Sequence, residues 1–174
     1  MGRTKDDAAS PTTGGTGSQT LDQFDNAVLA CMDDLGRSLP GLAERFDQLV
    51  VIEALAEHVG LALQALVRRQ ICDQTRVRLL IKRIEDIASC SKSTGSAVSD
   101  EQMSSQLSIR MCVAEISVVL PSLVDRHTCL VVICALTELL GGSIFVCHEA
   151  NLCSEAQARA TIRRVTHIAL GESK

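Results

Sequence analysis

The stretch that most constrains the fold is Leu130–Leu140, LVVICALTELL, which is followed directly by Gly141 and Gly142. Glu138 is the single charged residue inside it. The apolar residues fall on every side of a helical wheel, so a helix formed here must be buried all round. The run therefore predicts either the central helix of a helical domain or a membrane span.

Charge and glycine content favour the core helix over the membrane span. The apolar stretch can be extended to Cys129–Cys147, and about 18 apolar residues already make a candidate span. Glu138 near its middle would cost roughly 3 kcal/mol at a bilayer centre, and the pair Gly141-Gly142 weakens the helix. We therefore expect a buried core helix and no membrane partner.

Composition predicts one globular domain in a reducing compartment. The 174 residues suffice for a sizeable core, and 46% hydrophobic residues with a net charge of −4 are typical of a folded chain. With no Trp, no Tyr and three Phe, the chain lacks an aromatic platform for single-stranded nucleic acid. The N-terminus has no apolar signal segment, so we expect a cytoplasmic protein whose eight cysteines are free thiols.

Helical spacing of apolar residues predicts an all-α, single-domain bundle of about six helices around the central helix. Residues 1–19 are rich in Gly, Ser, Thr and Pro and predict a disordered tail, so the helical domain spans 20–171. The expected helices cover residues 20–36, 42–70, 73–89, 99–120, 122–140 and 154–171.

Capping signals set the expected helix ends. Thr20, Ser99 and Ser154 each precede Gln by three residues, a capping-box pattern that satisfies free N–H groups at a helix start. Pro121 is expected to end one helix and Ser122 to cap the next.

Two segments leave alternatives open. Gly60 interrupts the helix expected at 42–70 and indicates either close packing against a neighbour or a bend. Residues 143–152 fit a helical continuation or a short extended segment. No repeat with a fixed period of 20 to 50 residues is apparent.

A cluster of His and Cys residues raises the hypothesis of a metal site. The candidate ligands are His127, Cys129, Cys134, Cys147, His148 and Cys153. Zinc sites usually contain close pairs such as C-x2-C, whereas Cys129 and Cys134 would point about 140° apart on a helix. We therefore expect the cysteines to fill core space as small hydrophobes, and we predict no metal and no other cofactor.

The sequence gives no positive support for an enzyme. It lacks the G-x-S-x-G, H-E-x-x-H, Walker A and dinucleotide-binding patterns. Glu53 and Glu57 share a helix face, as an acid/base pair would, but we interpret them as a solvated acidic face.

Charge is distributed unevenly along the chain. Acidic residues dominate between 20 and 60, and a basic cluster follows, formed by Arg68, Arg69, Arg76, Arg78, Lys82 and Arg83. Such a cluster can contact nucleic-acid phosphates or an acidic face of a protein partner. The overall acidity and the missing aromatic residues favour the protein partner.

These patterns predict a non-enzymatic intracellular helical interaction or regulatory domain. We expect it to form a homodimer through its acidic and basic faces. One alternative is a helical ligand-binding domain for a hydrophobic small molecule or a metal, and another is a nucleic-acid-binding regulator that uses Arg68–Arg83. Glu138 is a buried polar candidate that needs a partner in the core, and Arg110, Arg126 and His127 are the candidates.

Overall fold

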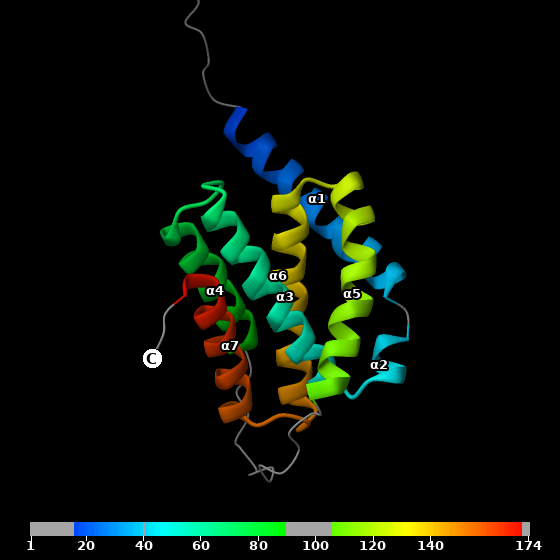
Figure 1. Ribbon diagram of the computed structural model, residues 1–174. Coiled ribbons are helices and arrows are strands. Elements are labelled where there is room, and N and C mark those ends of the chain that lie inside the picture. Colours follow the sequence, from blue (N-terminus) through cyan, green and yellow to red (C-terminus); the bar gives the residue numbers. More distant parts are fainter. Residues whose placement is uncertain (1–15, 40, 90–105, 172–174) are drawn as a thin grey trace, which may run out of the picture.

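The computed structural model describes residues 16–39, 41–89 and 106–171. Within these ranges the chain forms helices and no strand (Figure 1). The helices are α1 Thr16–Ser38, α2 Leu42–Arg45, α3 Gln48–Arg68, α4 Gln74–Ala88, α5 Gln106–Arg126, α6 Cys129–Glu149 and α7 Glu155–Leu170. The prediction of an all-α bundle is confirmed. Because α2 is a single turn, six helices of substantial length remain.

Two helices share the centre of the bundle. α6 packs on α1, α3 and α4, and α3 packs on α5, α6 and α7. Leu136 and Leu140 of α6 are at most 1% exposed, and Leu55 and Val59 of α3 are at most 2% exposed. The apolar run at 130–140 therefore does lie in the central helix, as predicted, but α3 is its equal partner.

α6 is longer than expected because Gly141 lies in a packed contact and not at a helix end. A Cβ atom at Gly141 would lie 3.0 Å from the Cβ of Ile87 in α4, so the glycine allows the two helices to approach closely. The helix continues to Glu149, and Asn151 makes the following turn with a φ of 56°. The open question at 143–152 is thus resolved in favour of the helical continuation.

The predicted boundary at Pro121 is wrong. Pro121 lies inside α5, which continues to Arg126. The helix interior loses a hydrogen bond at proline, but the continuation fully buries Leu123. The Ser122 hydroxyl donates to the Val119 carbonyl and caps no helix.

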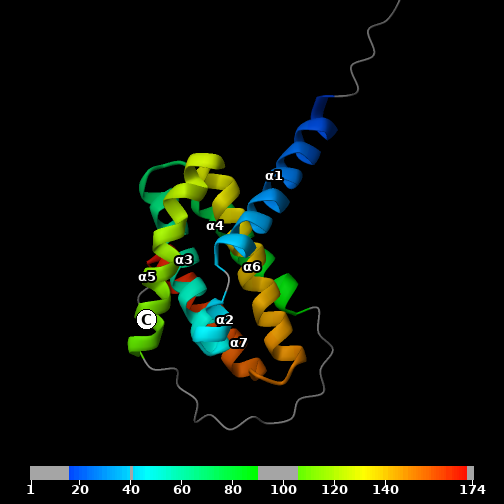
Figure 2. The ribbon, with the colours of Figure 1, turned by 90° about the vertical axis from the view of Figure 1, so that its right-hand side faces the viewer.

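Thr128, not Ser122, is the N-cap of α6, and its hydroxyl accepts from the Val131 N–H. At the other end of the chain, α1 begins at Thr16 instead of Thr20, because lengthening an existing helix costs little. Its first turns project beyond the bundle (Figure 2). Residues 1–15 of the expected tail lie outside the described residues, and so does the expected cap at Ser99.

The helix expected at 42–70 is split in two. Phe46 has an extended backbone, with φ −123° and ψ 145°. Asp47 then caps α3, since its carboxylate accepts from the Leu49 N–H. Asp at this position offers the backbone a cap that competes with helix continuation.

Other predicted ends are confirmed. Asp73 caps α4, and Ser154 and Gln157 form the complete capping box of α7. Gly171 ends α7 in the left-handed conformation, with a φ of 66°, which costs glycine little.

The bundle is built from two copies of one helical unit. Residues 49–60 read LVVIEALAEHVG and residues 130–141 read LVVICALTELLG, which are identical at eight of twelve positions. The N-caps Asp47 and Thr128 are separated by the same 81 positions. We call α1–α4 the first repeat and α5–α7 the second repeat, and residues 81 positions apart are equivalent. This spacing of 81 residues is longer than the 20 to 50 residues typical of repeat proteins.

The two repeats contact each other reciprocally, as subunits related by a two-fold axis do. A Cβ atom at Gly60 would lie 2.8 Å from the Cβ of Ile168 in α7. The equivalent glycine, Gly141, packs in the same way against Ile87, the equivalent of Ile168. Gly60 therefore marks close packing, one of its two expected roles. Since α3 packs mainly on α7 and α6 mainly on α4, each repeat completes the core of the other.

Equivalent ion pairs also join the repeats. They are Arg45–Glu115 with Arg126–Asp34, and Arg83–Glu138 with Arg164–Glu57. A contact that occurs twice in this way belongs to the shared frame of the two repeats. A feature present in one repeat alone is a better candidate for a function.

Candidate functional site

Glu138 has a partner that the sequence did not indicate. Its carboxylate accepts from Arg83 Nε at 2.7 Å and from Nη2 at 3.3 Å. None of the three expected partners takes this role. Arg126 and His127 instead bind Asp34, at 2.8 and 3.0 Å.

The hydrogen bond with His127 and the positive charge of Arg126 lower the pKa of the Asp34 carboxyl.

The six predicted basic residues are all exposed. Arg68 and Arg69 lie at the C-terminal end of α3, where positive charge stabilises the helix dipole. The other four lie on α4, where Arg83 is engaged with Glu138. Their role as an interaction patch stays a prediction.

The His and Cys candidates do not converge on a metal site. Among the residues that the structure describes, no three His, Cys, Asp or Glu side chains are placed to share an ion. Cys147 and Cys153 are buried, whereas Cys129 is exposed. Burial raises the pKa of Cys153 and of Cys134 to about 11, so both remain neutral thiols, as expected for cysteines that fill the core.

Glu53 and Glu57 do not form a solvated face, so that interpretation is wrong. Both carboxylates bind Arg164 of α7, whose Nη1 lies 2.7 Å from Glu53 and whose Nη2 lies 3.1 Å from Glu57. The Thr161 hydroxyl donates to the other oxygen of Glu53 at 3.1 Å. The sequence contains these residues, but only the packing of α3 against α7 brings them together.

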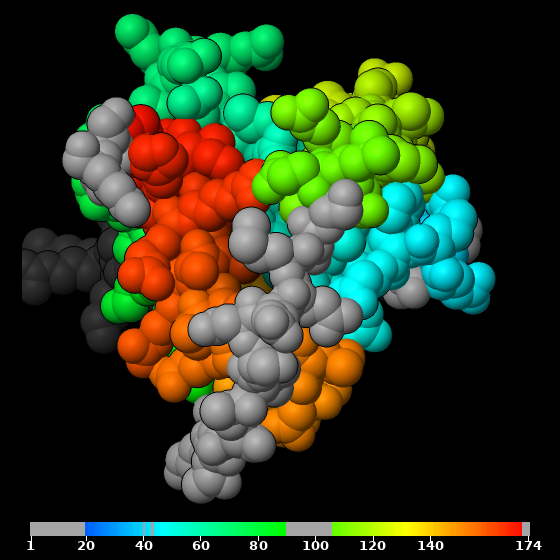
Figure 3. Space-filling model, turned by 60° about the horizontal axis from the view of Figure 1, so that its bottom comes forward, coloured from blue at the N-terminus to red at the C-terminus, as the bar shows by residue number. Residues whose placement is uncertain are grey.

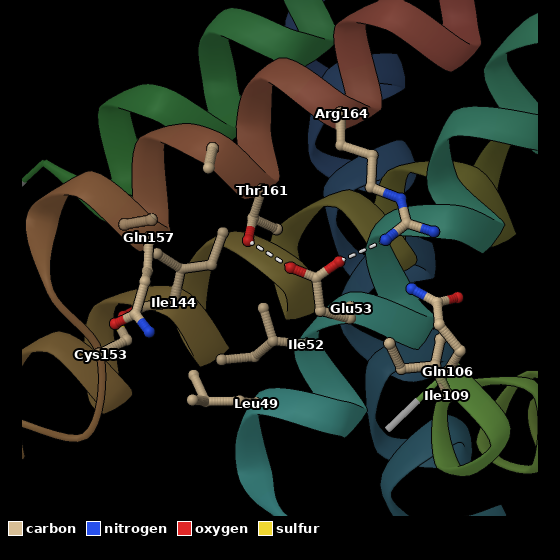
Figure 4. Close-up of a pocket in the computed structure, with 12 residues that line it drawn as sticks. Leu49, Ile52, Glu53, Gln106, Ile109, Ile144, Cys153, Gln157, Thr161 and Arg164 are labelled. Carbon is tan, nitrogen blue, oxygen red and sulfur yellow. Dashed lines mark hydrogen bonds and ion pairs between the residues drawn. The ribbon is translucent and has the colours of Figure 1, made fainter. Parts of the chain in front are cut away.

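Glu53, Thr161 and Arg164 line a cavity of about 220 Å³, which we call the polar cavity (Figure 4). Leu49 and Ile52 of α3 form an apolar wall, and residues of α5, α6 and α7 close the other sides. The dashed contacts in Figure 4 show that the carboxylate, the hydroxyl and the guanidinium face one another across one side of the cavity.

The α7 residues that line the polar cavity are smaller than their equivalents in α4. Small residues Ala158, Ala160 and Thr161 line it, and the equivalent residues of α4 are Val77, Leu79 and Leu80. Among its polar groups, Glu53 is hydrogen-bonded to both Thr161 and Arg164, so its carboxylate is engaged within the bundle.

A serine of α5 and a histidine of α3 lie as close together as a catalytic nucleophile and its general base. Ser117 Oγ of α5 lies 2.9 Å from His58 Nε2, and His58 Nδ1 lies 3.0 Å from the Ala54 carbonyl. A catalytic serine also needs free donors for an oxyanion, but the backbone N–H groups around Ser117 lie inside a helix. The contact is therefore best understood as a link between α3 and α5.

The outward side of α5 carries an apolar stripe with helical spacing. We call it the outer stripe, and it consists of Leu107, Met111, Ala114, Val118 and Pro121. All five residues are exposed, Leu107 by 68% and Val118 by 79%. In the space-filling view, α5 lies at the margin of the molecule beside α2 (Figure 3).

Of the five equivalent residues in the first repeat, three are polar and the other two are Ala30 and Pro40. Asn26, Asp33 and Arg37 stand where the second repeat has Leu107, Ala114 and Val118. All three are exposed. The outer stripe is thus a property of α5 and not of the duplicated frame.

Three helices, α3, α5 and α6, are long and apolar enough to cross a membrane. Of these, α5 is the least buried inside the bundle.

The protein is thus an all-α bundle of two repeats, in which α5 carries the exposed outer stripe. Comparison of the chain with protein-family models, with curated proteins and with solved structures found no match.

Proposed function

We propose that this protein is a non-enzymatic helical interaction domain that pairs with a second copy of itself through the outer stripe of α5. The observation that carries this proposal is the exposed apolar stripe, whose equivalent in α1 is interrupted by the polar residues Asn26, Asp33 and Arg37. Contiguous exposed apolar surface of this kind is typical of interaction sites in folded proteins. A two-fold contact between identical stripes is the commonest way in which identical chains associate.

Charges beside the stripe support an antiparallel pairing. Arg110 lies toward the N-terminal end of α5 and Asp125 near its C-terminal end. Both are exposed, and neither forms an ion pair with another described residue. An antiparallel pair places Arg110 of each copy toward Asp125 of the other, with Val118 near the middle of the contact.

Part of the acidic and basic faces expected from the sequence is already engaged within one chain. Arg83 and Arg164 bind Glu138, Glu53 and Glu57 within one chain. These charges hold the two repeats together, so we assign self-association to the apolar stripe instead.

The test is Val118→Arg, which gives α5 the residue that α1 carries at the equivalent position. We expect the wild type to sediment as a dimer and the variant as a monomer in analytical ultracentrifugation, with dimer affinity reduced more than tenfold. The matched control is Leu29→Arg, which gives α1 the residue found at Arg110. Leu29 is 60% exposed, and this variant should remain dimeric.

Two results would refute the proposal. One is a wild type that stays monomeric at high concentration, and the other is a Val118→Arg variant that still dimerises. Monomeric wild type that sediments with phosphatidylcholine vesicles, and loses this property in Val118→Arg, would assign the stripe to a membrane surface.

A further inference from the structure

The packing between α3 and α6 leaves two equivalent grooves, one at each end of the pair. At the first, the last turns of α5 lie over the ends of both helices, and Leu120 and Val124 line the hollow together with Val132 and Ile133. Only about 130 Å³ remains there. We call this the covered groove.

The equivalent groove lacks this cover. Val51 and Ile52 replace Val132 and Ile133, and Val146 and Cys147 of α6 form the opposite wall. Its volume is about 400 Å³, and Val146 is 58% exposed. We call this the open groove, and its walls are predominantly apolar.

A break in the first repeat removes the cover. α5 runs through Pro121 without interruption, whereas the equivalent chain leaves the helix after Leu39 and turns at Gly41 with a φ of 78°. Leu39, the equivalent of Leu120, does not line the open groove.

A glycine widens the open groove further. Gly142 lines it, and a Cβ atom there would have no neighbour within 4 Å. The equivalent residue in the first repeat is Leu61.

We infer that the open groove binds an amphipathic helix of a partner protein, presenting two apolar side chains one turn apart as Leu120 and Val124 do. The covered groove shows which kind of element fits the shared walls, and helices commonly bind in apolar grooves of this kind. The inference is independent of the proposed dimer, because the open groove and the outer stripe lie on different helices.

The rim of the open groove indicates that the partner helix carries basic residues. Glu138 lines the groove, but its carboxylate already binds Arg83. The acidic group left for a partner is Asp47, which lies at the α3 end of the groove beside Gln48. Asp47 forms no ion pair with any described residue. The Cys147 thiol of the opposite wall donates to the Gln48 side chain at 3.3 Å, so the adjacent residue Asp47 lies close to that wall.

The experiment uses a labelled peptide that copies the cover of the covered groove. It comprises residues 109–127 with Met111→Lys, Val118→Lys and Pro121→Ala. These changes remove the outer stripe, add positive charge and favour the helix. We expect saturable binding to the full chain in fluorescence anisotropy, weakened by salt, and no binding of the same peptide carrying Leu120→Asp and Val124→Asp.

Variants of the full chain locate the binding site. Val146→Asp places a charge in the open groove, and Gly142→Leu fills it with the residue of the equivalent position. Each should reduce peptide affinity at least tenfold while circular dichroism and the melting temperature report a folded bundle. Leu79→Asp, at a residue of α4 that is 62% exposed, is the matched control and should bind like the wild type.

Three outcomes would overturn the inference. The first is absence of peptide binding, and the second is binding that survives both Val146→Asp and Gly142→Leu. The third is a wild type that retains a hydrophobic small molecule in native mass spectrometry and releases it in Gly142→Leu without binding the peptide. This last result would assign the groove to a small ligand.

Discussion

Four glycines inside helices allow the reciprocal packing of the repeats to be tested by adding single methyl groups. A Cβ atom at Gly60 would lie 2.8 Å from the Cβ of Ile168, and one at Gly141 would lie 3.0 Å from the Cβ of Ile87. At Gly36 and Gly142 it would meet nothing within 4 Å. Crowded and open positions thus occur in the same molecule.

The expected free energies follow from two opposing effects. Gly→Ala in a helix interior gains about 1 kcal/mol, whereas overpacking costs about 1–3 kcal/mol. The close atom at Gly60 is a Cβ, which cannot rotate away, so α7 itself must move. We expect Gly60→Ala to lower the free energy of unfolding by about 2 kcal/mol and Gly141→Ala by about 1 kcal/mol, while Gly36→Ala and Gly142→Ala raise it by up to about 1 kcal/mol.

Urea denaturation followed by circular dichroism measures these changes. With a slope of about 2 kcal/mol per molar urea, the midpoint should fall by about 1 M in Gly60→Ala and by about 0.5 M in Gly141→Ala. The two control variants should shift it upward or leave it unchanged. If Gly60→Ala is as stable as Gly36→Ala, the close approach of α3 and α7 is refuted.

Two further predictions concern Asp34 and the thiols. Because the pKa of Asp34 is lowered in the folded state, its carboxylate stabilises the fold above the unfolded value of 3.8, and this contribution disappears as the pH falls through the folded value. The stability gap between wild type and Asp34→Asn should therefore close on acidification. Cys129 is exposed, and burial raises the pKa of Cys112 to about 11, so Cys129→Ser should remove one fast-reacting thiol in a titration of native protein and Cys112→Ser none.

Because the two repeats share one architecture, the same contacts occur twice in this molecule. Surfaces that differ between the repeats are therefore the candidates for function. The reciprocal pairs hold α3 on α7 and α6 on α4 in the same manner. The outer stripe, the polar cavity and the open groove each depart from this symmetry. A fold of two repeats can keep one copy of a surface for structure and change the other without losing the shared core.

Sequence periodicity alone determined the fold class and several helix ends. Apolar spacing predicted the bundle, the burial of Leu136 and a helix that starts at residue 73, and local hydrogen bonding predicted the cap at Ser154. These features depend on residues within one or two turns of each other, so they can be read from the chain. Even the repeat was present in the sequence, as the two matching stretches at 49–60 and 130–141.

Tertiary structure decided everything that depends on which helices meet. The partner of Glu138 is 55 positions away, and Glu53 meets Arg164 across 111 positions, distances over which spacing carries no information. Pro121 shows the same limit, because its local preference to end a helix yields to the burial of Leu123. Burial between distant segments outweighs local preferences by a few kcal/mol, and this contribution exists only once the chain is folded.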